Sequence, residues 1–381
     1  MAEMLSVIAR CLALPLALVA CSDGGGPSAN VRTGPSPAAS AVASYPPCTD
    51  LGAPSGGTRW TLASGLNKPD DLLYADGALY VAVLGSGAIE VLKSGLATAT
   101  LPVHIADVEG MVFIGSSFYA AGQAQDAVYE VSGSSLRKVI QLNPVPGQDG
   151  VDGIAAQGGL LIVPDSPRGV VDWVDPATGE IVHQVGGFTR PTGAWPLADG
   201  TVLIADEFGN AVAKVTAGGS KTYLTRDLPI ADDVAADSQV AVFVVNPAAA
   251  GGRLVQVLPD GTIRNVLTGL AAPQGLAVDG ADNLYFTEED AGRVDLLVRT
   301  FKLAALPAVS ASSTQPVCVH VRRAEGFTDP ITLIGGDGVR VLQQPGSGSE
   351  GSILVGSCPA GGCMLTARAG SRSDVTWLST R

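Results

Sequence analysis

A short phrase returns six times along the chain, and its spacing constrains the fold more than any other feature. Each copy opens a run of alternating apolar residues. Successive second residues of the phrase lie at positions 70, 109, 152, 192, 232 and 274, so the spacings are 39, 43, 40, 40 and 42. A period of about 40 to 45 residues is typical of a β-propeller, in which each repeat forms one four-stranded blade. The six copies read Pro69-Asp70-Asp71-Leu72, Val108-Glu109-Gly110-Met111, Val151-Asp152-Gly153-Ile154, Pro191-Thr192-Gly193-Ala194, Ala231-Asp232-Asp233-Val234 and Pro273-Gln274-Gly275-Leu276.

Each repeat continues with the same order of apolar runs and turns. After the opening phrase come three further strand candidates, separated by residue pairs that suit tight hairpins, such as Asp76-Gly77, Gly158-Gly159 and Asp260-Gly261. Many short strands with frequent glycine, 48 in all, and few runs of helical period predict an all-β protein.

The sixth repeat lacks a convincing fourth strand, and the missing strand is found at the other end of the chain. Residues 58–66 precede the first phrase and match residues 262–270, which end the fifth repeat. An N-terminal strand that completes the last blade fastens the ring and removes a free sheet edge. We therefore expect residues 58–300 to form one six-bladed propeller closed by an N-terminal strand.

Two segments carry a resemblance to a known group of propellers. Pro273-Gln274-Gly275-Leu276-Ala277-Val278-Asp279 and Leu203-Ile204-Ala205-Asp206 are similar to the blades of SMP-30/gluconolactonase-like and NHL-type propellers. Blades of those families open with Pro-Asp/Asn-Gly-Leu-Ala and continue with Leu-Tyr-Val-Ala-Asp. The resemblance implies the propeller fold for the whole repeat region. The same blades serve lactonases, lyases and interaction modules, so the fold alone does not imply an activity.

The opening phrase stops after Thr300. Residues 316–323 alternate at period two. Residues 326–333 resemble the Gly-Phe-Thr-Gly-Pro-Val-Thr-Leu motif of bacterial Ig-like modules, and residues 364–369 resemble the final strand of those modules. We expect a small Ig-like β-sandwich at residues 301–381, which is shorter than the roughly 100 residues of a full Ig domain. The alternative is an elaborated seventh blade. The predicted fold class is therefore a propeller followed by a small sandwich.

The first residues have the features of an export signal. The apolar run of ten residues from Cys11 to Ala20 is too short to span a bilayer and suits the core of a signal peptide. Leu18-Val19-Ala20-Cys21 resembles the lipobox of bacterial lipoproteins, which implies removal of residues 1–20 and a lipid anchor on Cys21. Ser22 resembles the sorting signal for an outer membrane. The alternative is an ordinary cleaved signal.

Residues 21–57 are mostly Gly, Ser, Pro and Ala and are expected to form a flexible tether. The expected location is thus the extracytoplasmic side of a bacterial cell envelope, with contact to the membrane through the lipid anchor only. The net charge of −13 and the absence of a basic run exclude a nucleic-acid partner, because binding to phosphates needs clustered Lys and Arg. We expect a monomer.

Four cysteines remain after the signal and the anchor. Outside the cytoplasm an even number indicates disulfides, here two with three possible pairings. We expect Cys318 to pair with Cys363 and Cys48 with Cys358. Metal binding by cysteine is the weaker interpretation, since the three histidines are scattered along the chain.

The second residues of the phrases are expected to converge at the mouth of the central tunnel. Asp70, Glu109, Asp152 and Asp232 then face one another. Two carboxylates ~7 Å apart repel by roughly 2 kcal/mol at an effective dielectric constant of ~20. In a narrow, dry tunnel a hard cation such as Ca²⁺ relieves this repulsion, because oxygen ligands without His or Cys select hard cations. In a wide, wet tunnel the same acids are solvated lining.

The resemblance to lactonases implies a catalytic cation that polarises an ester or lactone carbonyl while a carboxylate activates water. Asp71 and Asp233 are the candidate catalytic residues, one position after the ring. The chain departs from the family pattern because the ring has no Asn. The residues expected on the substrate-binding face are Thr192, Gln274, Asp165, Arg168, Asp206, Asn210, Glu288 and Arg293.

Two functions follow from this pattern. One is a divalent-metal-dependent hydrolase of lactones or similar small esters. The other is a non-catalytic propeller that binds a protein or glycan partner at the cell surface. A dry site with four acid oxygens within metal-ligand distance favours the hydrolase, and an open, wet tunnel favours the binding protein.

Overall fold

The computed structural model describes residues 59–94, 96, 98–248, 251–304, 315–359 and 362–378. All of these belong to the unit formed by residues 46–381. The predicted signal peptide, the lipidation site Cys21, the tether and Cys48 lie outside the described residues. The helices in the described part are three short 3-10 turns: η1 (Leu84–Ser86), η2 (Gln123–Gln125) and η3 (Ser166–Arg168). None of its helices has the length and apolar character needed to cross a bilayer.

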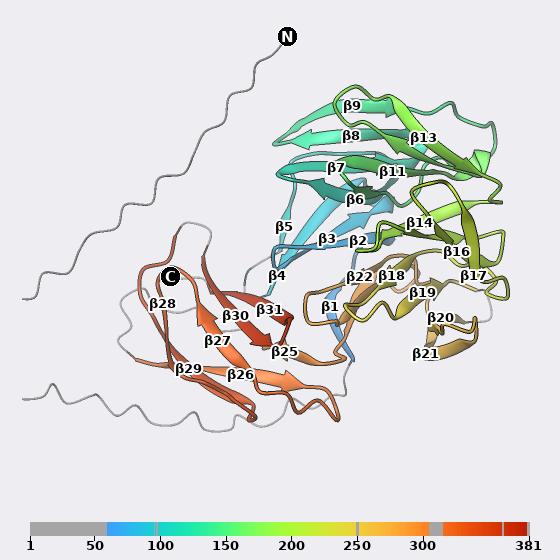
Figure 1. Ribbon diagram of the computed structural model, residues 1–381. Coiled ribbons are helices and arrows are strands. Elements are labelled where there is room, and N and C mark those ends of the chain that lie inside the picture. Colours follow the sequence, from blue (N-terminus) through green and yellow to red (C-terminus); the bar gives the residue numbers. More distant parts are fainter. Residues whose placement is uncertain are drawn as a thin grey trace, which may run out of the picture. The chain divides into compact units, whose positions relative to one another are not determined.

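Five four-stranded antiparallel sheets each consist of four consecutive strands (Figure 1). Sheet 1 contains β2 (Pro69–Ala75), β3 (Ala78–Val83), β4 (Ala88–Lys93) and β5 (Ala99–Thr100). Sheet 2 contains β6 (Val108–Ile114), β7 (Ser117–Gly122), β8 (Ala127–Ser132) and β9 (Ser135–Gln141). Sheet 3 contains β10 (Ala155–Gln157), β11 (Leu160–Asp165), β12 (Val170–Val174) and β13 (Ile181–Gly186).

Sheets 4 and 5 follow the same order. Sheet 4 contains β14 (Pro191–Pro196), β15 (Val202–Asp206), β16 (Ala211–Val215) and β17 (Lys221–Thr225). Sheet 5 contains β18 (Val234–Ala236), β19 (Val242–Asn246), β20 (Gly252–Val257) and β21 (Ile263–Leu270). The second strands β15 and β19 are buried along their whole length, which explains why both are continuous apolar runs rather than alternating ones.

Sheet 6 combines strands from the two ends of the repeat region. It has the order β1-β24-β23-β22, with β22 (Leu276–Val278), β23 (Leu284–Glu288), β24 (Arg293–Leu297) and β1 (Arg59–Ser64). Strand β1 pairs antiparallel with β24, so that Trp60 lies opposite Leu296. In Figure 1 the blue strand β1 accordingly lies among the yellow and orange strands of sheet 6.

Apolar clusters join each sheet to the next and the last sheet to the first. The first strands also form a closed series of contacts, from β2 through β6, β10, β14, β18 and β22 back to β2. The sheets therefore form a closed ring around their first strands. The clusters contain Ile89 with Phe118 (sheets 1 and 2), Val128 with Leu161 (2 and 3), Ile162 with Ile204 (3 and 4), Leu203 with Val244 (4 and 5), Phe243 with Phe286 (5 and 6) and Tyr285 with Leu79 (6 and 1).

The C-terminal strands form two further sheets. Sheet 7 has the order β25-β26-β29-β28, with β25 (Phe301–Leu303), β26 (Val317–Arg323), β28 (Val339–Gln343) and β29 (Glu350–Val355). Sheet 8 contains β27 (Thr332–Gly335), β30 (Cys363–Ala369) and β31 (Arg372–Leu378). Both sheets contribute to one apolar core, for example Val319 from sheet 7 and Leu365 from sheet 8. Residues of two sheets that share one core form a β-sandwich.

The predicted disulfide pairings are wrong. Cys358 is bonded to Cys363, and their Cα atoms lie 4.9 Å apart. Cys363 therefore cannot pair with Cys318, nor Cys358 with Cys48. The physical reason lies in strand alternation: Val319 and Val321 face the core that includes Cys363, so Cys318, at the intervening position, points to the other face of β26. Cys318 is itself disulfide-bonded.

Candidate functional site

The opening phrases lie next to one another at the centre of the ring. The backbone N–H of Gly110 donates to the carbonyl oxygen of Asp152 (3.3 Å), and that of Gly193 donates to the carbonyl oxygen of Asp232 (3.1 Å). The hydroxyl of Thr192 donates to the same carbonyl of Asp232 (2.6 Å). Each of these bonds joins the phrase of one sheet to the phrase of the next.

Glycine at the third position of the phrase allows this close approach. A Cβ on Gly110 would lie 2.1 Å from the backbone nitrogen of Ile154, and one on Gly275 would lie 2.7 Å from the Cα of Asp71. Both distances are far below van der Waals contact, and both neighbours are backbone atoms of the adjacent sheet. The repeated glycine is therefore a packing requirement.

Three acids at the second position of the phrase are held in an environment that disfavours their charge. Asp70 is 8% exposed and Glu109 is 3% exposed. Burial, followed by the proximity of other carboxylates, raises the pKa of Glu109 and of Asp232 well above the usual range. Burial likewise raises the pKa of Asp70, while a hydrogen bond from Glu109 opposes the rise. The same hydrogen bond raises the pKa of Glu109 and lowers that of Asp70.

The fourth acid, Asp152, has a cationic partner that the sequence analysis did not single out. Arg190 Nη2 lies 3.2 Å from Asp152 Oδ2, and Arg190 Nε lies 2.5 Å from Glu207 Oε2. Burial raises the pKa of Asp152, and the charge of Arg190 opposes this rise. The sequence sign of this contact is that Arg190 is a basic residue immediately before the fourth opening phrase.

Asp71 and Asp233 line a central cavity of about 220 Å³ whose other walls are mostly apolar, with Met111 and Trp195 among them. Asp71 accepts N–H bonds from Leu72 (2.7 Å) and Met111 (3.2 Å). Asp233 accepts the matching pair of N–H bonds from Val234 (2.7 Å) and Leu276 (2.8 Å). Each carboxylate therefore bridges its own sheet to the next one.

Burial raises the pKa of both cavity acids. Burial raises the pKa of Asp71 to about 7. Burial raises the pKa of Asp233 well above its usual range, and the nearby charge of Asp71 adds to that rise. Proton transfer is most effective when the pKa lies near the working pH, so Asp71 can both take up and release a proton at neutral pH.

The residues at the centre of the ring supply some of the oxygen ligands that a hard cation prefers. The Oε1 atom of Gln274 is buried without a hydrogen-bond partner, while its Nε2 donates to Glu289 (3.1 Å). An unpartnered buried carbonyl oxygen fits a cation that prefers oxygen ligands. However, no group of three or more His, Cys, Asp or Glu in the described part of the chain is arranged to hold a metal ion.

Most of the other predicted binding-face residues make structural contacts. Asp206 accepts the backbone N–H groups of Thr189 and Arg190 (2.9 and 2.8 Å), and Asp165 pairs with Arg168 (2.7 Å). The remaining three lie at similar loops: Asn210 accepts the N–H of Ile230 (3.4 Å), and Glu288 pairs with Arg293 (2.7 Å). Asp165, Asp206 and Glu288 each end the second strand of a sheet, so they support loops rather than join the acids of the opening phrases.

Comparisons with known proteins identify the fold. No family model matches the chain, and no curated protein matches it by sequence. A luciferin-regenerating enzyme aligns with a TM-score of 0.52 at 12% identity, covering 63% of this chain and 95% of that one. A gluconolactonase from Xanthomonas campestris aligns with a TM-score of 0.51 at 11% identity, covering 62% and 88%.

A protein of unknown function from Bacteroides thetaiotaomicron aligns with a TM-score of 0.50 at 14% identity, covering 63% of this chain and 72% of that one. At such low identities the likeness concerns the fold alone. The ring of four-stranded sheets is a β-propeller.

Proposed function

We propose that this chain is a lipid-anchored protein of the bacterial cell envelope whose propeller binds a hard divalent cation and hydrolyses lactones or related small esters. The observation that carries the proposal is the group of carboxyls at Asp70, Glu109 and Asp232, the first two buried and the third half-buried, with pKa values well above the usual range. Carboxyls with strongly shifted pKa values that gather at one point of a fold are typical of functional sites.

The proposal includes a particular architecture. The six four-stranded sheets are interpreted as six blades, with β1 as the closing strand. Sheets 7 and 8, of four and three strands, are interpreted as a small Ig-like sandwich, since that strand count is the one of a constant-type Ig domain. Cys21 supplies the lipid anchor, and the tether holds the propeller outside the cell.

In the proposed reaction some residues would hold the cation and others would transfer protons. Asp70, Glu109, Asp232 and the free carbonyl oxygen of Gln274 would hold the cation, for which Ca²⁺ is the first candidate. When bound, such an ion polarises a carbonyl oxygen and lowers the pKa of water. Asp71, with a pKa of about 7, accepts a proton from water at neutral pH. Asp233, whose pKa is also raised by burial, would supply the proton that passes to the departing oxygen.

A melting experiment tests the cation directly. Binding to the folded state alone adds ~2.7 kcal/mol of stability at an ion concentration a hundredfold above the dissociation constant. The melting temperature of the wild type is therefore expected to rise with Ca²⁺ and to fall with a chelator. Asp232→Asn should shrink both responses, whereas Asp260→Asn, in an exposed turn, should leave them unchanged.

Two results would count against this proposal. If the wild type melts at the same temperature with calcium and with chelator, it has no such cation site. A calcium response that Asp232→Asn does not alter places the ion elsewhere. A pH-stat assay with simple lactones tests the hydrolase separately, because opening of the lactone ring releases an acid. Asp71→Asn is expected to abolish most of that rate.

One set of observations favours a non-catalytic binding propeller instead. Asp152 is already neutralised by Arg190, and the described acids form no group arranged for a metal. Phe208 is 60% exposed and lies with its ring 5.4 Å from the Arg190 guanidinium carbon. Exposed aromatic side chains are common at binding surfaces. If Phe208→Ala abolishes binding to a purified glycan panel while Val240→Ala does not, this second function gains support.

A further inference from the structure

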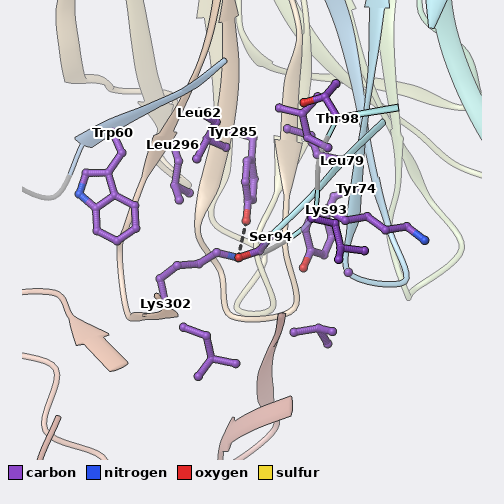
Figure 2. Close-up of a pocket in the computed structure, with 15 residues that line it drawn as sticks. Trp60, Leu62, Tyr74, Leu79, Lys93, Ser94, Thr98, Tyr285, Leu296 and Lys302 are labelled. Atoms are coloured by element: carbon purple, nitrogen blue, oxygen red, sulfur yellow. Dashed lines mark hydrogen bonds between the residues drawn. The ribbon is translucent and has the colours of Figure 1, made fainter. Parts of the chain in front are cut away.

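A second cavity, of about 270 Å³, lies where sheets 1 and 6 of the propeller meet the C-terminal sheets (Figure 2). None of its lining residues also lines the cavity of Asp71 and Asp233. Its walls are largely apolar or aromatic. They include Trp60 and Leu62 from β1, Tyr74 from β2, Leu296 from β24, Leu303 from β25 and Val375 from β31.

Lys302, one of the two lysines that line this cavity, is already compensated. Lys302 donates to Tyr285 Oη (2.7 Å), as the dashed line in Figure 2 marks, and it also forms ion pairs with Asp374 and Asp279. Tyr285 in turn donates to Asp279 (2.9 Å). Two carboxylates thus face one ammonium group, and all three hydrogen atoms of Lys302 are used. Lys93 also lines the cavity, but its Nζ lies 4.8 Å from the ring centre of Trp377, and in Figure 2 it points away from Tyr285 and Lys302. The buried ammonium of Lys302 therefore has no free hydrogen atom to offer an anion.

Tyr74 provides the polar group that a ligand can use. Its ring stacks on that of Tyr285, with centroids 5.3 Å apart and an angle of 24° between the planes. Its hydroxyl has no hydrogen-bond partner among the described residues, although the side chain lies against the cavity. A phenol hydroxyl can both donate and accept, and it is usually paired when it is enclosed.

We propose that this cavity binds a neutral, mostly apolar small molecule of one or two rings, with a single hydrogen-bonding group that meets the hydroxyl of Tyr74. The volume is close to the lower end of the range for small-molecule sites, and the lining has the usual mixture of apolar walls and few polar groups. The indole and phenol rings of Trp60, Tyr74 and Tyr285 suit a flat ring system. This proposal is independent of the cation site.

A fluorescence titration of the full chain with N-phenyl-1-naphthylamine tests the proposal, because this neutral two-ring amine becomes bright in apolar surroundings. The wild type is expected to bind one molecule saturably. Leu62→Trp fills part of the cavity and should weaken binding at least tenfold. Leu136→Trp is the matched control, since Leu136 is 38% exposed on β9 and Leu62 is 39% exposed on β1. This control should bind as the wild type does.

Tyr74→Phe keeps the ring and removes only the hydroxyl, so it should weaken binding about fivefold, the value of one net hydrogen bond. Melting temperatures of all variants identify any that fail to fold. Signal that does not saturate, or equal affinity in Leu62→Trp and the wild type, would overturn the proposal. Tighter binding of the anionic dye 1-anilinonaphthalene-8-sulfonate than of the neutral amine would also overturn it, since Lys93 or Lys302 would then attract an anion into the cavity.

Discussion

Asp71 takes the third position of its opening phrase, where four of the six phrases have glycine. Glycine serves there because a side chain meets the backbone of the next sheet, whereas the Asp71 carboxylate accepts an N–H from that sheet instead. The enclosure that makes this bond possible also raises the pKa of Asp71 to about 7. Asp71 thus connects two sheets and remains protonated at pH values where an exposed Asp is ionised.

This raised pKa predicts how stability depends on pH. The folded state binds the proton of Asp71 up to a pH of about 7, whereas an unfolded Asp releases it near 3.9. Between these values the folded state binds more protons, so the stabilisation is complete below about pH 4 and is lost as the pH rises through 7. One proton corresponds to a slope of about 1.4 kcal/mol per pH unit.

We therefore expect the free energy of unfolding of Asp71→Asn to fall less steeply from pH 4.5 to 7.5 than that of the wild type. Urea unfolding at several pH values measures the slope, which is independent of any constant loss from the changed N–H bonds. Asp260→Asn serves as a control because Asp260 is exposed and its pKa is lowered, so the slope should not change. Equal slopes for the wild type and Asp71→Asn would show that Asp71 ionises normally.

At this scale the sequence predicted which residues would lie at the centre but not all of their partners. The repeated phrase places Asp70, Glu109 and Asp232 at equivalent positions, and they influence one another's pKa. Arg190 reaches Asp152 and Glu207 across two loops, and no spacing in the sequence marks that contact. Side-chain pairing between repeats depends on rotamers that periodicity does not specify.

Ion pairs help to hold strand β1 in a sheet whose other strands lie far away in the sequence. Its Arg59 forms ion pairs with Glu288 at the end of β23 and with Asp295 on β24, and both acids are 1% exposed. The guanidinium carbon also lies 5.2 Å from the ring centre of Phe286. Arg293 contacts the same two acids, so the pair of arginines neutralises a buried pair of carboxylates.

Arg59→Met is expected to lower the free energy of unfolding by about 1 to 3 kcal/mol. Each acid keeps its ion pair with Arg293, but Glu288 loses one charged hydrogen bond and Asp295 loses two. Lys68→Met removes an exposed pair, since Lys68 is 57% exposed next to Glu289, and should cost about 0 to 1 kcal/mol. Denaturant unfolding of both variants provides the measurement. Equal losses in the two variants would mean that Arg59 does not fasten β1.

The sequence predicted elements best where a period or an alternation marks them. The expected strand at residues 316–323 is β26, Val317–Arg323, and the one at 364–369 is β30, Cys363–Ala369. The disulfides were wrong because cysteine spacing says nothing about the face of a strand on which a side chain lies. Cys318 and the core residue Val319 are neighbours in sequence and point in opposite directions.

At the scale of the whole molecule, the C-terminal sheets share a buried network with the propeller. Lys302 on β25 contacts Asp374 on β31 as well as Tyr285 on β23. Backbone bonds reinforce this contact, since Ser373 N–H donates to Gly280 (2.8 Å) and Trp377 N–H donates to Ser94 (2.9 Å). The end of the repeat suggested a boundary near residue 300 but gave no sign that the two parts are joined by buried charges.

Lys302→Met is expected to destabilise the contact by about 3 to 5 kcal/mol, because it leaves the carboxylate of Asp374 buried without its cation. Calorimetry should then show the C-terminal sheets melting at a lower temperature than the propeller. Adding Asp374→Asn removes the charge that lies nearer to Lys302 and keeps an oxygen for the N–H of Leu303. Asp279 retains its bonds from Asn283 and Tyr285, so the double variant should regain part of the loss.

The pH dependence separates charge from packing. Burial raises the pKa of Asp374 to about 6 even with Lys302 opposing the rise, so without Lys302 the carboxyl should be protonated at still higher pH. The penalty of Lys302→Met should therefore be clearly smaller at pH 5 than at pH 8, whereas the double variant should show no such difference. A penalty that is the same at both pH values would come from lost packing of the lysine side chain, and the buried charges would then not be what joins the C-terminal sheets to the propeller.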